Sequence, residues 1–178
     1  MSSAVIYTDL DGSLLDHHTY AFSEAQPTLT ALLERGIPII PCTSKTRAET
    51  LNLMQTMGID GPMIIENGAA IWVPLDWGLE RPEGSDGDAH AWCHSFGPSR
   101  GMIRRQLAIL NIEWGNRYQS LCDLSDKQVA AVTGLDLESA ARAKQRQHSE
   151  TLVWLGTPAD RNAFAAQVEA LDMRCVEG

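Results

Sequence analysis

Two aspartates, Asp9 and Asp11, are the residues whose type and spacing point most directly to chemistry. They follow the apolar residues 5–7, and in an open parallel sheet ligands bind at the carboxyl ends of the strands. Two carboxylates so close together repel each other, and a bound divalent cation that prefers oxygen ligands offsets this repulsion. We therefore predict that Asp9 and Asp11 are ligands of a Mg2+ ion.

The same aspartates predict phosphoryl transfer. Asp9 can attack a phosphoryl group and form an aspartyl-phosphate, while the cation neutralises the phosphoryl oxygens. Asp11 can protonate the leaving oxygen and later activate water. The alternative is that Asp-x-Asp-Gly forms only a turn after a strand, because Asp and Gly are common turn residues.

Hydroxyl and cationic side chains follow the next apolar segment, residues 37–42. These are Thr43, Ser44, Lys45 and Arg47. We predict that Thr43 holds the phosphoryl group, aided by the amide groups of the helix N-terminus that follows. For Ser44, Lys45 and Arg47, ligand contact and a solvated, capped first turn of that helix remain equal alternatives.

Strands and helices alternate around these residues. We expect strands at residues 4–8, 37–42 and 62–65, and helices at residues 24–34 and 46–57. This alternation predicts an α/β fold with a parallel sheet and right-handed crossovers. Asn67-Gly68 lies between two apolar runs and predicts a two-residue hairpin with an antiparallel strand pair.

A change in composition at residues 81–88 indicates a linker. This stretch is rich in Pro, Glu, Gly, Ser and Asp, so we divide the chain into residues 1–81 and 82–178. In the second part we expect helices at residues 99–112, from 125, at 136–147 and from 157, and strands at 151–155 and 173–176. The second part is therefore predicted to be α+β.

Several segments together resemble a known superfamily. The resemblance is to the haloacid dehalogenase superfamily, and it lies in residues 9–12, the strand end at Thr43 and residues 66–69. A narrower resemblance, to the mannosyl-3-phosphoglycerate phosphatase family, lies in residues 8–20, 44–49 and 66–71. It implies a Rossmann-like core with a mobile α+β cap, and Mg2+-dependent hydrolysis of mannosyl-3-phosphoglycerate to mannosylglycerate.

The resemblance also implies substrate contacts. In the first part of the chain these are Glu66, Asn67 and Gly68, for which a simple hairpin turn is the alternative.

In the second part, which resembles the cap, the implied substrate contacts are Arg146, Ser149 and Glu150. The alternative for Arg146 is a solvated basic helix face shared with Arg142 and Lys144.

Two further elements of the superfamily have no match in this sequence. They are the lysine that steadies the nucleophile and phosphate, and a later acidic cluster of the Gly-Asp-x-x-Asn-Asp type. The chain therefore resembles the first part of the core followed by the cap, and we expect the C-terminal core segment to be missing from it.

The charge of the chain limits the kinds of molecule that it can be expected to bind. The 178 residues include 14 basic and 23 acidic side chains and carry a net charge of -9, which disfavours a broad grip on nucleic acid or on an anionic membrane. The four cysteines form no Cys-x-x-Cys pair, and no targeting segment or membrane span is predicted. We expect a cytoplasmic protein that binds a small phosphorylated sugar acid; the sequence makes no prediction of oligomeric state.

Two other interpretations stay open. One is a phosphoacceptor signalling module resembling a response-regulator receiver, which would carry its phosphate at the end of the third strand, where this chain has Glu66 in place of Asp. The other is a catalytically incomplete fragment of a sugar phosphatase. His17 and His18 are expected in an exposed loop rather than at the metal.

Overall fold

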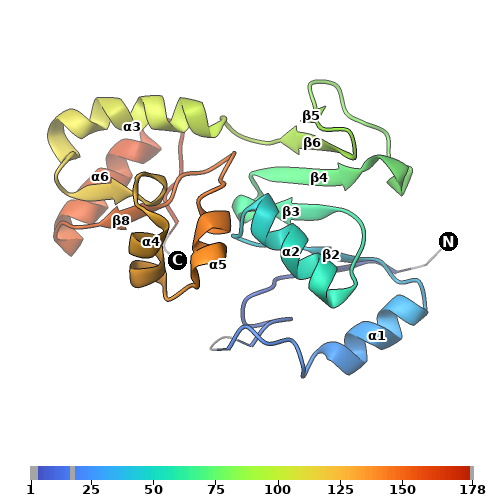
Figure 1. Cartoon of the computed structure of the whole chain (residues 1–178). Helices are drawn as coiled ribbons and strands as arrows, with labels where there is room; N and C mark the ends of the chain where they lie inside the picture. Colours follow the sequence, from blue (N-terminus) through green and yellow to red (C-terminus); the bar gives the residue numbers. More distant parts are fainter. Residues whose placement is uncertain (1–3, 17–18, 177–178) are drawn as a thin grey trace. The chain divides into compact units, whose positions relative to one another are not determined.

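The computed structural model describes residues 4–16 and 19–176, which form two compact units (Figure 1). The first unit runs to Pro98 and also includes Gln145–His148, and the second comprises Ser99–Lys144 and the residues from Ser149 onward. His17 and His18 lie outside the described residues. The first unit thus extends beyond the predicted division after residue 81, because the strands at residues 86–95 pair within its sheet.

A parallel strand pair opens the first unit. β1 (Ile6–Thr8) and β2 (Ile39–Pro41) are joined by α1 (Gln26–Glu34) and lie in parallel, with Ile6 opposite Ile39. All three residues of β2 are buried, as expected of a strand covered on both faces. The predicted parallel pairing is confirmed.

The third strand extends this arrangement. β3 (Met63–Ile65) follows α2 (Arg47–Met57), and a parallel bridge joins Cys42, just after β2, to Ile64. The helix α2 contacts β3. The α/β fold class predicted from strand and helix alternation is therefore present.

β3 belongs to a second, four-stranded sheet in which every strand pairing is antiparallel. β4 (Ala70–Pro74) pairs with β3, which confirms the predicted antiparallel pair, but the connection is a 3-10 turn, η1 (Glu66–Gly68), rather than a two-residue hairpin. β6 (Ala91–Ser95) and β5 (Asp86–Gly87) add two antiparallel strands that the composition did not reveal, because polar residues fill most of this stretch. A second 3-10 turn, η2 (Leu75–Trp77), follows β4.

One hydrophobic core holds the first unit together. It draws on both helices, the strands and the loop after β1, and includes Leu10, Leu29, Met54, Ile65 and Trp72. Leu10 and Ile65 are completely buried, so the loop that carries the aspartates is fixed to the core by its intervening leucine.

The second unit is α+β, as predicted. Its elements are α3 (Arg100–Trp114), β7 (Tyr118–Ser120), η3 (Leu121–Asp123), α4 (Asp126–Thr133), α5 (Leu137–Ala143), β8 (Leu152–Trp154) and α6 (Pro158–Glu169). β7 and β8 are antiparallel. One cluster of buried side chains lies between α3, α6 and this strand pair, and a second joins α4, α5 and η3.

Two predictions for the second part of the chain are wrong. The helix expected to reach residue 147 ends at Ala143, and Gln145–His148 belong to the first unit. The strand expected at residues 173–176 does not form; this stretch is irregular and mostly exposed, and it has no partner strand among the described residues. No helix in the described part of the chain has the length and apolar character needed to cross a membrane.

The start of α2 supplies a test of this fold. Thr46 is completely buried and caps the helix, because its hydroxyl accepts the N–H of Glu49 while the Glu49 carboxylate accepts the N–H of Thr46. We expect Thr46→Ala to lower the free energy of unfolding by about 1 to 2 kcal/mol, measured by urea denaturation. The matched control is Thr28→Ala on the exposed face of α1, which should change stability by less than about 0.5 kcal/mol. Equal effects of the two substitutions would contradict the capping role.

Candidate active site

The loop after β1 is a tight turn that presents Asp9 and Asp11. The N–H of Gly12 donates to the carbonyl of Leu15 at 2.9 Å, and the N–H of Leu15 donates to the carbonyl of Leu10 at 2.8 Å. Gly12 has φ +71°, a left-handed conformation that favours glycine. The Asp9 carboxylate accepts the N–H of Leu10 at 2.7 Å, so both the backbone and the carboxylate of the predicted nucleophile are held locally.

A cavity of about 380 Å³ lies where the strand ends of the first unit converge. The residues that line it are Asp9, Asp11, Cys42, Thr43, Ser44, Ile64, Asn67 and Gly68. Sequence reasoning singled out all of these except Cys42 and Ile64, which are strand-end residues with no chemical signature of their own. Burial, together with the nearby Asp9 carboxylate, raises the pKa of the Cys42 thiol, so this thiol stays protonated at neutral pH.

Thr43 is the buried centre of the cavity wall, with 4% of its surface exposed. Its N–H donates to the carbonyl of Ile64 and its carbonyl accepts the N–H of Asn67, both at 3.0 Å. Its hydroxyl accepts the N–H of Lys45 at 3.2 Å. These bonds fasten the loop after β2 to the turn after β3, so that the hydroxyl of Thr43 lies in a rigid part of the wall.

Lys45 forms an ion pair with Asp11. Its ammonium group donates to Asp11 Oδ2 at 2.9 Å and lies 2.8 Å from Oδ1, where the angle does not make a second hydrogen bond. Lys45 also lies over the ring of Tyr20, with Nζ 5.2 Å from the ring centre. Lys45 therefore places positive charge against one of the two carboxylates of the cavity.

The carboxylates fit a hard cation. Asp9 and Asp11 offer oxygen atoms, the ligands that hard cations prefer, and the Asp11 carboxylate also forms an ion pair with Lys45. No group of three or more His, Cys, Asp or Glu side chains in the described part of the chain could share an ion. Mg2+ is commonly held by one or two carboxylates, with water and substrate oxygens completing its shell.

Arg47 does not line the cavity. Its guanidinium stacks on the ring of Trp72 at 3.6 Å and its NH2 group contacts Asp88 at 2.6 Å. The pKa of Asp88 falls to about 2, chiefly because its carboxylate accepts a hydrogen bond from the backbone N–H of His90 and, with a smaller effect, one from the Arg47 guanidinium. The structure thus engages Arg47 in the sheet of the first unit, and substrate contact by Arg47 stays a prediction.

Glu66 and Arg146 lie together in the first unit. The Glu66 carboxylate is fully buried and accepts the backbone N–H groups of Gln147 and His148. Arg146 Nε lies 4.0 Å from Glu66 Oε2, and its NH2 group donates to the carbonyl of Ser44 at 2.7 Å. Arg146 therefore reaches a residue of the cavity wall.

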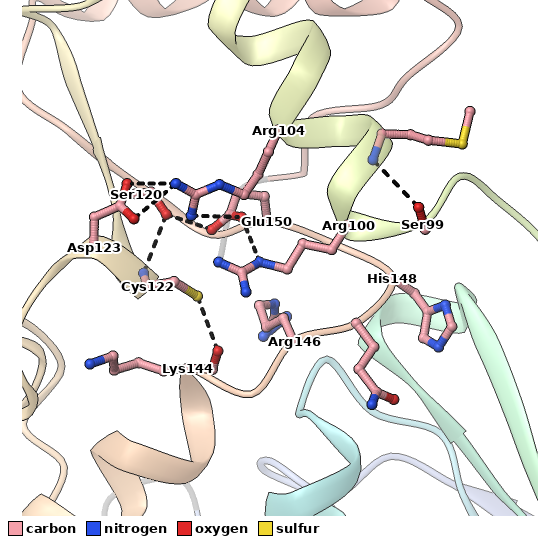
Figure 2. A network of polar contacts seen from close by, with 12 residues as sticks. Ser99, Arg100, Arg104, Ser120, Cys122, Asp123, Lys144, Arg146, His148 and Glu150 are labelled. Atoms are coloured by element: carbon pink, nitrogen blue, oxygen red, sulfur yellow. Dashed lines mark hydrogen bonds and ion pairs between the residues drawn. The ribbon is translucent and has the colours of Figure 1, made fainter. Parts of the chain in front are cut away.

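Ser149 and Glu150 belong to the second unit. The Glu150 side chain is 1% exposed and accepts hydrogen bonds from Arg100 Nε at 2.7 Å and from the hydroxyl of Ser120 at 2.6 Å. Figure 2 shows Arg100 and Arg104 extending from α3 toward this carboxylate. Glu150 therefore has an internal role in the second unit that its sequence position alone does not reveal.

A second polar cluster of the first unit includes a cysteine. The thiol of Cys93 lies 3.7 Å from His148 Nε2, and the hydroxyl of Ser95 lies 2.6 Å from His148 Nδ1. A thiol beside an imidazole is a common nucleophile arrangement. Here burial, with a smaller effect of the Asp86 carboxylate, raises the pKa of Cys93 to about 11, which argues for an inert thiol.

Comparison with known proteins finds a matching family and several similar structures. Residues 6–78 match the family of haloacid dehalogenase-like hydrolases. A haloacid dehalogenase-like hydrolase from B. subtilis is similar in structure, with a TM-score of 0.51 at 18% identity over 93% of this chain and 66% of that one. A phosphatase of the haloalkanoate superfamily from Bacteroides thetaiotaomicron gives a TM-score of 0.55 at 19% identity over 94% and 60%. A protein from Thermotoga maritima gives 0.55 at 19% over 95% and 62%.

These likenesses identify the fold of the chain. The chain has the haloacid dehalogenase-like α/β fold. Its match to that hydrolase family covers the segment with the aspartate loop, Thr43 and the turn after β3. The chain spans 60% to 66% of the length of the three similar structures.

The reactivity of Cys93 tests whether the thiol of the second polar cluster is inert. With a pKa of about 11, only about one thiol in a thousand is ionised at pH 8. We expect iodoacetamide to label Cys93 at least about 100-fold more slowly in the folded protein than in urea, measured by mass spectrometry of the labelled peptide. Equal labelling rates in the folded and unfolded protein would show that the thiol is not buried and that its pKa is not raised.

Proposed function

We propose that this chain carries the nucleophile and cap of a Mg2+-dependent phosphatase that hydrolyses a phosphorylated sugar acid. Mannosyl-3-phosphoglycerate is the proposed substrate. The observation that supports the reaction best is the convergence of Asp9, Asp11 and Thr43 on one cavity from separate strand ends. The resemblance of the surrounding segments to mannosyl-3-phosphoglycerate phosphatases supports the substrate.

The proposed reaction has two steps. A carboxylate oxygen of Asp9 attacks phosphorus, and the bond from phosphorus to the sugar-acid oxygen breaks while Asp11 gives that oxygen a proton. Asp11 then takes a proton from water, which attacks the aspartyl-phosphate and releases phosphate and Asp9. Bound Mg2+, with Asp9 and Asp11 as its protein ligands, would neutralise charge on the phosphoryl oxygens.

The cavity wall supplies the remaining groups in this proposal. The Thr43 hydroxyl donates to a phosphoryl oxygen, and Lys45, which is not part of the wall itself, pairs with Asp11. Ser44, Asn67 and Gly68 surround the same space. We propose that the second unit is the cap, with Ser149 contributing to recognition of the sugar acid and the buried Glu150 holding Arg100 in place within the unit.

The nucleophile is tested by Asp9→Asn. We expect Mg2+-dependent phosphate release from mannosyl-3-phosphoglycerate to fall by roughly 10³-fold or more, because an amide cannot form the acyl phosphate. Phosphate is measured colorimetrically with mannosyl- and glucosyl-3-phosphoglycerate and with simple sugar phosphates, with and without a chelator. Asp60→Asn, an exposed change of the same type, is the control. Full activity of Asp9→Asn would rule out this mechanism, whereas no phosphate release from the unaltered folded protein would favour the catalytically incomplete fragment.

Thr43 distinguishes a phosphate-holding hydroxyl from a packing residue. Thr43→Ala should lower kcat/KM by about 100-fold, since one donor to the transferred group is lost, whereas Thr43→Ser keeps the hydroxyl and should retain most activity. Steady-state kinetics of both variants, with circular dichroism to verify folding, make the comparison. If the serine variant is as impaired as the alanine variant, packing of the Thr43 methyl group rather than its hydroxyl is what the site requires.

A further inference from the structure

Glu66 is a fully buried carboxylate whose position calls for an explanation. Its side chain has 0% exposure, and a charge removed from water is tolerated only where it is paired and hydrogen-bonded. Oε1 accepts the N–H of Gln147 at 2.9 Å, and Oε2 accepts the N–H of His148 at 3.1 Å. Both donors lie more than 80 residues later in the chain, so Glu66 joins two distant segments of the first unit.

The backbone at Glu66 is held in an uncommon conformation. Glu66 has φ +51° and Asn67 has φ +61°, both in the left-handed region that non-glycine residues seldom adopt. The N–H of Glu66 donates to the carbonyl of Lys45 at 3.0 Å, so the turn is bound to the loop that carries Thr43 and Lys45. Such a conformation persists only where surrounding contacts enforce it, and observed backbone strain of this kind clusters at functional sites.

Arg146 contacts both Glu66 and a residue that lines the cavity. Its side chain is 11% exposed; Nε faces Glu66 Oε2 at 4.0 Å, and NH2 donates to the carbonyl of Ser44 at 2.7 Å. Ser44 is part of the cavity wall. Glu66 thus holds both the backbone that follows Arg146 and one edge of its guanidinium.

The charged residues at the cavity indicate how Arg146 could act on a bound ligand. Asp9 and Asp11 are both in the wall, and Lys45 pairs with Asp11 alone. A phosphate ester carries about two negative charges, so positive charge beside the wall favours its binding in addition to any cation held by these carboxylates.

We propose that Glu66 is a positioning residue that fastens Gln145–His148 to the first unit and so fixes Arg146 beside Ser44, where Arg146 assists binding of the phosphoryl group. The fastening stands on the geometry alone, whereas the phosphoryl-binding role rests on the proposed function. Glu66 acts through Arg146 and does not itself touch the substrate.

Amide hydrogen exchange followed by NMR tests the fastening without any catalytic readout. In the full chain, the backbone N–H groups of Gln147 and His148 should be protected, and Glu66→Gln should accelerate their exchange by about tenfold or more, because one of the two acceptor oxygens is replaced by the NH2 group of a carboxamide, which donates and does not accept. Glu34→Gln, an exposed change of the same kind at the end of α1, should leave these amides unchanged. Unprotected amides in the unaltered protein would overturn the fastening even if Glu66→Gln failed to fold.

Binding of inorganic phosphate in the presence of Mg2+ tests the coupling to Arg146. Calorimetry should show Kd weakened about tenfold by Arg146→Met and by Glu66→Gln, with no further loss in the double variant, because both changes remove the same cation from the site. Additive losses would show that Glu66 acts independently of Arg146, and an unchanged Kd with faster amide exchange would leave Glu66 a structural clamp only; each overturns the proposal.

Failure of the proposed function has a different signature. The unaltered protein would then neither bind phosphate nor release it from any ester, while the amides of Gln147 and His148 would still respond to Glu66→Gln. That outcome overturns the phosphoryl-binding role of Arg146 and retains the fastening.

Discussion

The parallel alignment of β1, β2 and β3 is the constraint on which the candidate site depends. The aspartate loop, Thr43 and the turn after β3 are separated by more than 20 residues at each step of the sequence, and they meet because the carboxyl ends of these strands lie at one edge. Backbone bonds from Thr43 to Ile64 and from Asn67 to Thr43 join the last two segments directly. Main-chain hydrogen bonds therefore hold these two segments of the cavity wall together, and side-chain substitutions disturb such bonds least.

Local charge pairing resolves a conflict between the composition and the proposed substrate. A chain with a net charge of -9 repels a phosphate ester at long range, so positive charge must be supplied where the ester binds. Lys45 lies against Asp11, and Arg146 lies against Glu66 and Ser44. Cations close to the cavity act over a few ångströms, where they are screened far less than the distant surface charge.

Buried glutamates solve the same physical problem in both units. Glu66 and Glu150 have almost no exposed side-chain surface, and each would be costly to bury alone. Backbone N–H groups satisfy Glu66, whereas Arg100 and Ser120 satisfy Glu150. In each unit the buried carboxylate bonds to segments that lie far apart in the sequence. The carboxylate is stable in the interior only while these bonds are formed, so it restrains the relative positions of those segments.

Local patterns in the sequence determined the elements whose signals are complete within a few residues. The capping box at Thr46 and Glu49 starts α2, and the apolar run before Asp9 forms β1, because both depend on near neighbours. The tertiary structure alone decided that residues 91–95 form a strand, that residues 173–176 do not, and that Gln145–His148 leave their predicted helix. Those outcomes depend on which distant partner supplies hydrogen bonds. Likewise, the carboxylate types at positions 9, 11 and 66 are visible in the sequence, but only folding brings the first two to the cavity wall and buries the third, because burial is a property of packing rather than of residue type.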